Sequence, residues 1–207
     1  LENLTFYAGA YGITDARQIS ASISRTGLQG HERALTRELS AGWRQRLALG
    51  IALVHEPKVL FLDEPTSGVD PTARRNFWDL IYSLAEEGVT VLVTTHYLDE
   101  AEYCNCVGMM RNGKLLAMDT PRALKERYIK GNVSELYISS LTDGLTILNG
   151  IPEVNLASLA GDHIRMITDG DLRERDFEKI LNKAGINVTS IQRGEPTLED
   201  VFTTLAR

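Results

Sequence analysis

An apolar run that ends in two carboxylates and a proline limits the folds open to this chain more than any other stretch. Residues 59–62 are all apolar, and Asp63, Glu64 and Pro65 follow them. A run without polar alternation predicts a central strand of a parallel sheet that is covered on both faces. Ligands of such sheets lie beyond the carboxyl ends of the strands, where Asp63 and Glu64 would emerge. Two carboxylates there can divide the work of holding a divalent cation and polarising a water, whereas an isolated pair more often ends a strand in a solvated turn.

A second candidate site precedes this strand. Ser40 is a good N-cap, and the apolar stripe after it predicts a helix over residues 41–54, which Pro57 closes. The turn Ser40-Ala41-Gly42 leaves backbone N–H groups free at the positive end of the helix dipole, which is typical of an anion-binding site. The alternative is a capped core helix without a ligand.

A histidine follows the next predicted strand. Asp70 and Pro71 predict a helix that runs to Gly88, with Asp70 as its N-cap. Residues 89–94 then predict a second buried strand, and His96 comes just past its end. Because parallel strands end at the same edge of a sheet, His96 is placed beside the carboxylates of the first strand and could meet a phosphate. A lone histidine, by contrast, is more often structural.

The remainder of the chain carries turn signals but no catalytic constellation. Residues 107–111 and 114–118 predict a hairpin that turns at Asn112-Gly113. From residue 134 the pattern strand, helix, strand, strand, helix, strand predicts a ferredoxin-like arrangement. We therefore expect a small α+β domain at residues 134–207, reached through a linker at Asn132-Val133, with a regulatory or dimerising role.

Composition and charge exclude several classes of protein. With 43% hydrophobic and 24% charged residues, the 207-residue chain is typical of a globular protein of one large or two small domains. A net charge of −6 without a block of lysine or arginine argues against a nucleic-acid partner. No apolar run is long enough to cross a bilayer, and there is no signal-peptide pattern. Cys104 and Cys106 are too close for an unstrained bridge, which favours the reduced thiols of a cytosolic protein.

Four motifs in this order resemble the C-terminal two-thirds of an ATP-binding cassette (ABC) nucleotide-binding domain. Residues 39–43, Leu-Ser-Ala-Gly-Trp, match the family signature, usually Leu-Ser-Gly-Gly-Gln. Residues 59–63 with Glu64 match the Walker B strand and its catalytic glutamate. Residues 67–70 match the D-loop, and His96 matches the switch histidine.

The resemblance implies an α/β fold with two parts. Residues 1–131 would form a partial P-loop NTPase-like ABC ATPase domain, with a helical and signature part at 1–56 and a parallel-sheet core from Walker B to the H-loop at 57–131. Residues 134–207 would form a C-terminal accessory α+β domain. The tail, which includes residues 195–202, is similar to the extra domain of drug- and polysaccharide-exporter ATPases.

The resemblance also implies roles for the candidate residues in phosphoryl transfer. Asp63 would help to hold Mg²⁺ through water, Glu64 would orient or deprotonate the attacking water, and His96 would contact the γ-phosphate. Asp70 would link the two ATP sites of a dimer. The signature residues that would contact the ATP of the opposite subunit are Ser40, Ala41 and Gly42.

Two features depart from the family pattern. The signature has Ala41 where glycine is usual and Trp43 where glutamine is usual, so we expect a weakened phosphate contact. The sequence contains no Gly-x-x-x-x-Gly-Lys-Ser/Thr, the Walker A loop that cradles phosphates, and no glutamine loop after it. It also begins at Leu1. We therefore expect an N-terminally truncated fragment that does not hydrolyse ATP by itself, although its parent protein is an ATPase.

As a function, the resemblance implies the ATP-binding subunit of an ABC transporter that couples ATP hydrolysis to export. ATP and Mg²⁺ would be its ligands, and a second ABC ATPase domain (a homodimer or a paired cassette) and a transmembrane permease its partners. The permease would hold it at the inner face of the cytoplasmic membrane. Two alternatives stay open: a soluble ABC ATPase without a transporter, and a degenerate, non-enzymatic dimer partner.

Overall fold

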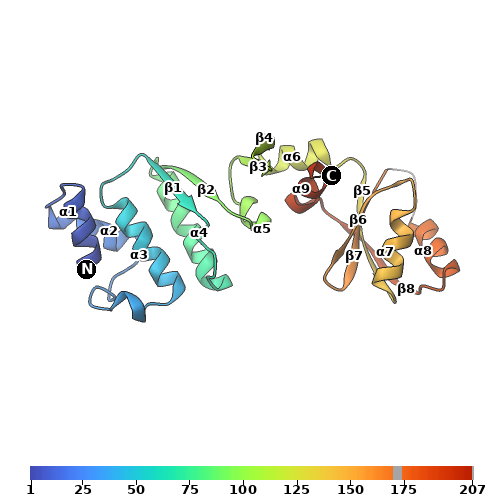
Figure 1. Ribbon diagram of the computed structural model, residues 1–207, viewed down its shortest axis with the longest axis horizontal. Coiled ribbons are helices and arrows are strands. Elements are labelled where there is room, and N and C mark those ends of the chain that lie inside the picture. The colour runs from blue at the N-terminus through green and yellow to red at the C-terminus, as the bar shows by residue number, and fades with distance from the viewer. Residues whose placement is uncertain (170–173, 207) are drawn as a thin grey trace. The chain divides into compact units, whose positions relative to one another are not determined.

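The computed structural model describes residues 1–169 and 174–206, which divide into two compact units (Figure 1). The first unit is Leu1–His96 and the second is Tyr97–Arg207. In the described residues, no helix combines the length and the apolar character needed to span a bilayer.

The first unit combines helices with a small parallel sheet. Its elements are α1 (Glu2–Ala10), α2 (Ala16–Arg25), the 3₁₀ turn η1 (Thr36–Glu38), α3 (Ala41–Leu53), β1 (Val59–Asp63), α4 (Pro71–Glu86) and β2 (Thr90–Thr94). Strands β1 and β2 pair in parallel, with Val59 opposite Thr90 and Asp63 opposite Thr94. Both strands therefore end at one edge of the sheet, as the sequence predicted.

Two helices of this unit begin at the predicted caps. The Ser40 hydroxyl accepts a hydrogen bond from the Trp43 N–H at the start of α3, 3.5 Å away. The Asp70 carboxylate accepts from the N–H groups of Thr72 (3.1 Å) and Ala73 (2.9 Å) at the start of α4. These bonds satisfy backbone donors that a helix leaves unpaired at its N-terminus.

The prediction that the strand at residues 59–63 is covered on both faces is wrong. Leu60 is buried, but Val59 and Phe61 are 47% and 73% exposed, and Leu92 on β2 is 56% exposed. In the first unit β1 pairs only with β2, so one set of alternating side chains is left uncovered. An apolar run shows that a strand can be buried on two faces, but not which elements are present to cover them.

The second unit begins with a short helix and a hairpin, followed by a larger sheet. Its elements are α5 (Leu98–Ala101), β3 (Val107–Arg111), β4 (Lys114–Asp119), α6 (Pro121–Tyr128), β5 (Asn132–Ile138), α7 (Leu141–Asn149), β6 (Val154–Ala160), β7 (His163–Thr168), α8 (Glu174–Lys183), β8 (Val188–Gly194) and α9 (Leu198–Leu205). The β3–β4 hairpin turns at Asn112 and Gly113, whose φ angles of 49° and 74° are those that a two-residue hairpin turn needs.

The larger sheet has the strand order β6-β7-β5-β8, and every neighbouring pair is antiparallel. Asn132 and Val133 begin β5 and pair with Thr168 and Ile167, so the predicted linker is part of the sheet. The start of β5 has partners on both sides, because Val133 also pairs with Gly194 of β8. Local composition alone does not reveal such long-range pairing.

Each face of this sheet carries its own apolar cluster. The cluster shared with α7 and α8 comprises Leu136, Leu148, Ala157, Ile164, Met166, Phe177, Leu181 and Ile186. The second cluster joins the sheet to α5, α6, α9 and the hairpin, and comprises Ala101, Val107, Met109, Ala117, Leu124, Ile129, Val133, Leu156, Ile167, Leu198 and Val201. Because successive side chains of a strand point to opposite faces, Val133 and Leu136 of β5 belong to different clusters.

Candidate functional site

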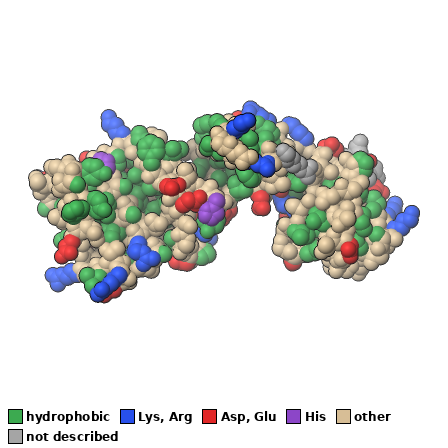
Figure 2. Space-filling model, viewed as in Figure 1, with side chains coloured by type: hydrophobic (Ala, Val, Ile, Leu, Met, Phe, Trp, Pro, Cys, Tyr) green, Lys and Arg blue, Asp and Glu red, His purple; other side chains and the backbone are tan. Residues whose placement is uncertain are grey.

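The carboxyl ends of β1 and β2 bring Glu64 and His96 into contact. His96 Nδ1 lies 2.6 Å from Glu64 Oε2, and the two side chains are 59% and 37% exposed. The Glu64 N–H donates to the Thr94 carbonyl at 3.0 Å, and the Thr94 hydroxyl donates to the Asp63 carboxylate. Figure 2 shows acidic side chains next to a histidine on the surface. The result is an open polar site that an approaching ligand can reach.

Glu64 has an unusual backbone conformation at this site. Its φ angle is 47°, in the left-handed region, which costs a residue with a Cβ about 1–2 kcal/mol. The bond to Thr94 and a second bond, from the Ser67 N–H to the Glu64 carbonyl (3.1 Å), hold this turn. Glu56, with a φ of 52°, shows that such a conformation is not by itself the mark of a site. At Glu64 this conformation accompanies a direct contact between the carboxylate and His96.

Asp63 supplies an oxygen ligand suited to a divalent cation, but not a complete site. No group of three or more His, Cys, Asp or Glu in the described residues could hold a metal ion. Mg²⁺ commonly takes one or two protein carboxylates and completes its shell with water and phosphate oxygens. The Asp63 carboxylate, oriented by the Thr94 hydroxyl, fits that partial role.

The turn Ser40-Ala41-Gly42 lies against the N-terminus of α4. A Cβ on Gly42 would come 3.0 Å from the Ala73 Cβ and 3.7 Å from Val69 Cγ1, so only glycine fits without displacement. The turn and Asp70 therefore form a second group of predicted residues, built on two helix N-termini whose dipoles favour anions.

Trp43, at the position where the family usually has glutamine, packs against the ring of His31 in a tilted arrangement. The ring centroids are 4.0 Å apart, and the Arg46 guanidinium carbon lies 5.5 Å from the Trp43 ring. Arg46 is held in turn by a hydrogen bond from Nη1 to the Thr26 carbonyl, 2.9 Å long. These contacts connect the start of α3 to residues that precede the helix in the chain. No local pattern in the sequence predicts these contacts, because His31 lies in the irregular segment between α2 and η1.

We expect Trp43→Gln to destabilise the first unit by about 1–2 kcal/mol, because it removes both the ring contact with His31 and the cation–π contact with Arg46. Urea unfolding followed by circular dichroism would measure the loss. Trp43→Phe keeps a ring over His31 and should lose clearly less. Equal losses in both variants would show that the ring contact with His31 contributes nothing to stability.

Thr94 is a further site residue that no local pattern in the sequence predicts. Its signal was the register of the sheet, since Thr94 lies opposite Asp63. Pairing register depends on contacts between distant segments and is not visible in either strand alone.

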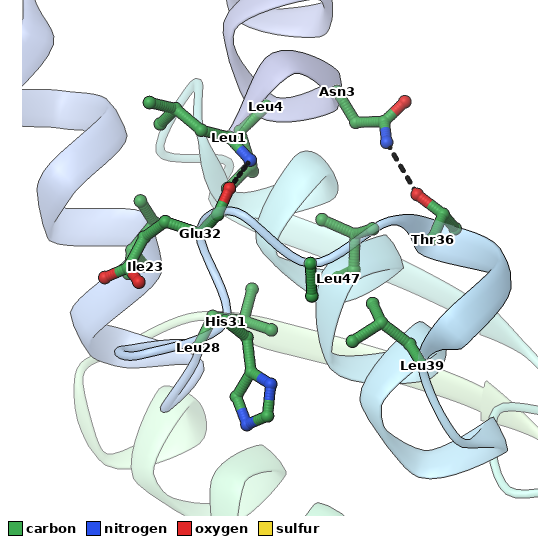
Figure 3. Close-up of a pocket in the computed structure, with 11 residues that line it drawn as sticks. Leu1, Asn3, Leu4, Ile23, Leu28, His31, Glu32, Thr36, Leu39 and Leu47 are labelled. Carbon is green, nitrogen blue, oxygen red and sulfur yellow. Dashed lines mark hydrogen bonds between the residues drawn. The ribbon is translucent and has the colours of Figure 1, made fainter.

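A pocket in the helical part of the first unit holds none of the predicted site residues (Figure 3). Its lining is mainly aliphatic, and includes Leu4, Ile23, Leu28 and Leu47. Its polar contacts at the rim are already made within the chain; for example, Asn3 Nδ2 donates to Thr36 Oγ1 at 2.9 Å. The Glu64–His96 pair is therefore the stronger candidate for chemistry.

Residues 29–98 match the family model described as "AAA domain, putative AbiEii toxin, Type IV TA system". This stretch contains both groups of predicted residues but less than half of the chain. Of the solved structures, the chain resembles cbiO1 from Clostridium perfringens, titled as part of the ABC transporter complex cbiONQ (TM-score 0.53, 31% identity, 57% of this chain and 50% of that one). It also resembles an ATP binding subunit of an ABC transporter (TM-score 0.52, 27% identity, 61% of this chain and 55% of that one).

Several of the curated relatives are named as ATP-binding proteins. The chain is 52% identical over 127 residues to "Probable multidrug ABC transporter ATP-binding protein YbhF" of Escherichia coli (strain K12), which covers 60% of this chain and 22% of that protein. It is 30% identical over 212 residues to the linearmycin resistance ATP-binding protein LnrL of Bacillus subtilis (strain 168), covering 99% of this chain and 68% of that protein. It is also 30% identical over 208 residues to the Nod factor export ATP-binding protein I of Rhizobium sp. (strain N33), covering 99% and 66%.

The chain thus spans about a fifth of the Escherichia coli relative and about two thirds of the other two. The match to LnrL extends over almost the whole of the chain, including the second unit. The chain belongs to the ATP-binding proteins of ABC transporters, in the exporter-type branch to which these relatives belong.

Proposed function

We propose that residues 1–207 are part of an ATP-hydrolysing subunit of an ABC exporter. The observation that carries the proposal is the contact between Glu64 and His96 at the carboxyl ends of two parallel strands, with Asp63 beside them. An acceptor for a proton, a ligand for a cation and an imidazole donor are among the groups that enzymes use to hydrolyse ATP.

In this proposal the three residues have separate tasks. Glu64 orients the attacking water and accepts its proton, and the hydrogen bond with His96 fixes the direction of its carboxylate. His96 contacts the γ-phosphate, which its exposure permits. Asp63 would hold Mg²⁺ through water, and the ion would supply positive charge next to the phosphates.

The second group of residues acts on the ATP of an opposite subunit. Ser40, Ala41 and Gly42 offer backbone N–H groups at the positive end of the α3 dipole, which suits a γ-phosphate. Ala41 allows less backbone freedom than glycine and weakens this contact. Asp70, which caps α4, links the two ATP sites.

We propose further that the chain contains two domains by descent, an ABC ATPase part at residues 1–131 and an accessory part at 134–207, although residues 97–131 pack within the second compact unit. The connection β5-α7-β6-β7-α8-β8 and the order β6-β7-β5-β8 support a ferredoxin-like fold for the accessory part. The partners of the whole protein would be a second ABC ATPase domain and a transmembrane permease, which holds it at the inner face of the cytoplasmic membrane. Export as the direction is supported by the Nod factor export relative.

A calorimetric titration with Mg-ATP tests this proposal. We expect residues 1–207 not to bind at micromolar ATP, because the sequence contains no Gly-x-x-x-x-Gly-Lys-Ser/Thr loop to cradle the phosphates. A longer protein that joins such a loop to residues 1–207 should both bind and hydrolyse ATP. Micromolar binding by residues 1–207 would contradict the expectation that the phosphate-cradling loop provides most of the affinity for ATP. A longer protein that binds but never hydrolyses would favour the degenerate, non-enzymatic alternative.

A further inference from the structure

Thr94, the last residue of β2, is hydrogen-bonded to both carboxylate residues at the end of β1. Its carbonyl accepts from the Glu64 N–H (3.0 Å), and its hydroxyl accepts from the same N–H (3.3 Å). The hydroxyl in turn donates to Asp63 Oδ1. These bonds follow from the register of the sheet, which places Thr94 opposite Asp63. All three residues belong to the first unit, so the arrangement lies wholly within it.

The bonds through the Thr94 hydroxyl run in one direction. A hydroxyl has a single proton to donate and two lone pairs that accept. Here it accepts from the backbone N–H of one carboxylate residue and gives its proton to the side chain of the other. Such a chain is cooperative, because each bond polarises the next, and a bond that ends on a carboxylate is stronger than one between neutral groups. A side chain without a hydroxyl at this position makes neither bond.

For Asp63 the consequence is an oriented carboxylate. Asp63 is exposed, so without a partner its side chain would exchange among conformations that water solvates. The bond to Oδ1 holds one oxygen and leaves Oδ2 to meet the water shell of a cation. Partners of this kind help to decide how tightly a ligand residue holds its metal, and their loss typically costs about 10–100-fold in affinity.

For Glu64 the consequence is a fixed backbone. Its φ angle of 47° lies in the left-handed region, which persists only where the surroundings over-determine it. Two of the bonds that hold this turn join its own N–H to Thr94. The turn also sets the direction of the side chain, whose Oε2 lies 2.6 Å from His96 Nδ1. Loosening the N–H therefore loosens the contact of the carboxylate with the histidine.

We propose that Thr94 is a positioning residue whose hydroxyl holds the cation ligand Asp63 and the base Glu64 in one arrangement. Its meaning for catalysis rests on the proposed function of these two carboxylates. Thr94 acts through them, so loss of its hydroxyl weakens cation binding and loosens the base at the same time. Serine should therefore replace threonine at this position, whereas valine, which has the same branched shape, should not.

Hydrogen exchange of the Glu64 amide tests the backbone half of this proposal in the 207-residue chain. Thr94→Val keeps the carbonyl and the branched side chain but removes the hydroxyl. We expect the Glu64 N–H, followed by nuclear magnetic resonance, to exchange about three- to tenfold faster, the range for losing one hydrogen bond. Thr94→Ser should stay within about twofold of the unmodified chain. Thr94 is exposed, so neither change leaves a cavity in the core.

Manganese binding tests the side-chain half in a longer protein that joins a phosphate-binding loop to residues 1–207. Mn²⁺, which takes the same oxygen ligands as Mg²⁺, is visible to electron paramagnetic resonance. Adenylyl imidodiphosphate replaces ATP, so no turnover is needed. Thr94→Val should raise the Mn²⁺ concentration at half-saturation by about tenfold or more, and Thr94→Ser should restore it. A purely structural role would not give a loss that the serine hydroxyl alone reverses.

Thr90→Val is the matched control. Thr90 is the first residue of β2, is exposed like Thr94, and pairs with Val59 at the other end of the two strands. Both readouts should stay unchanged in this variant. In Thr94→Val, the Thr90 amide, which donates to the Lys58 carbonyl at 2.9 Å, is an internal reference for opening of the whole sheet.

Unchanged exchange at Glu64 in Thr94→Val overturns the proposal, and so does an equal rise at Glu64 and Thr90, which would mean a general loosening of the sheet. Unchanged Mn²⁺ binding, or a Thr94→Ser variant that fails to restore it, overturns it as well. The exchange measurement uses no nucleotide, so the role of Thr94 can fail while the longer protein hydrolyses ATP. Conversely, hydrolysis that survives Glu64→Gln contradicts the proposed function and leaves both readouts of Thr94 as they are.

Discussion

Glu64→Gln is expected to lower ATP hydrolysis by about 10²–10⁴-fold while leaving Mg-ATP binding intact, the range that loss of one positioned general base produces. Glutamine has nearly the shape of glutamate and can keep a hydrogen bond to His96 Nδ1, which lies 2.6 Å from the glutamate oxygen. It cannot accept a proton from water. The fall corresponds to about 3–5 kcal/mol of transition-state stabilisation. Release of phosphate should be measured in a protein that joins a phosphate-binding loop to residues 1–207.

Glu56→Gln is the control for this substitution. Glu56→Gln removes the same charge, and Glu56 shares the positive φ angle, at 52° against 47° for Glu64. Glu56 lies just before β1, however, and is exposed. We expect hydrolysis within about twofold of the unmodified protein, as for most surface substitutions away from a site. If Glu64→Gln retained more than a tenth of the activity, or if Glu56→Gln lost as much, Glu64 would not be the base.

Local signals in the sequence predicted most of what surrounds this glutamate. Ser40 and Asp70 are found as helix caps because a cap needs only a side-chain oxygen and the next two or three N–H groups. The Asn112-Gly113 turn is found for the same reason, since its chemistry lies within two residues. The meeting of Glu64 with His96 followed from one further rule, that parallel strands end at a common edge.

What the sequence did not predict depends on contacts between distant segments. The exposed face of β1 reflects which elements lie beside it, and an apolar run carries no record of them. The Arg165–Asp200 pair joins residues that are 35 positions apart, and its only local signal is an arginine between Ile164 and Met166 on a strand. A charge in such a place indicates a buried partner, but not which one.

Arg165→Met is expected to destabilise the second unit by about 3–5 kcal/mol. The substitution leaves the buried carboxylate of Asp200 without its cationic partner. Asp200 would keep its bonds from Thr197 but lose both bonds from the guanidinium, and Glu135 would lose its partner. For a unit of this size the thermal midpoint should fall by more than about 10 °C. Differential scanning calorimetry measures it directly.

The dependence of this loss on pH separates the stranded charge from lost packing. Burial raises the pKa of Asp200, but hydrogen bonds from Arg165 and Thr197 outweigh it, and the pKa lies below its ordinary value. The pair therefore stabilises the unmodified chain above about pH 4, the pKa of an aspartate in the unfolded chain, and this stability is lost as the pH falls through the folded pKa. In Arg165→Met the guanidinium no longer opposes the effect of burial on the pKa of Asp200, so this pKa should rise. Protonation of Asp200 at low pH then removes the unpaired buried charge and restores part of the stability of the variant. The difference between the two proteins should be largest at pH 7 and shrink towards pH 3.5.

Two further variants decide whether charge is the cause. Arg122 pairs with Glu126 on the surface of α6, 87% exposed, and Arg122→Met should leave the midpoint nearly unchanged. Adding Asp200→Asn to Arg165→Met removes the stranded charge and should recover part of the lost stability, because the amide oxygen still accepts from Thr197. A loss that is equal at pH 7 and pH 3.5, with no recovery in the double variant, would assign the effect to the missing arginine stem instead. The ion pair would then orient α9 without contributing through its charge, and the sheet would hold the helix by packing alone.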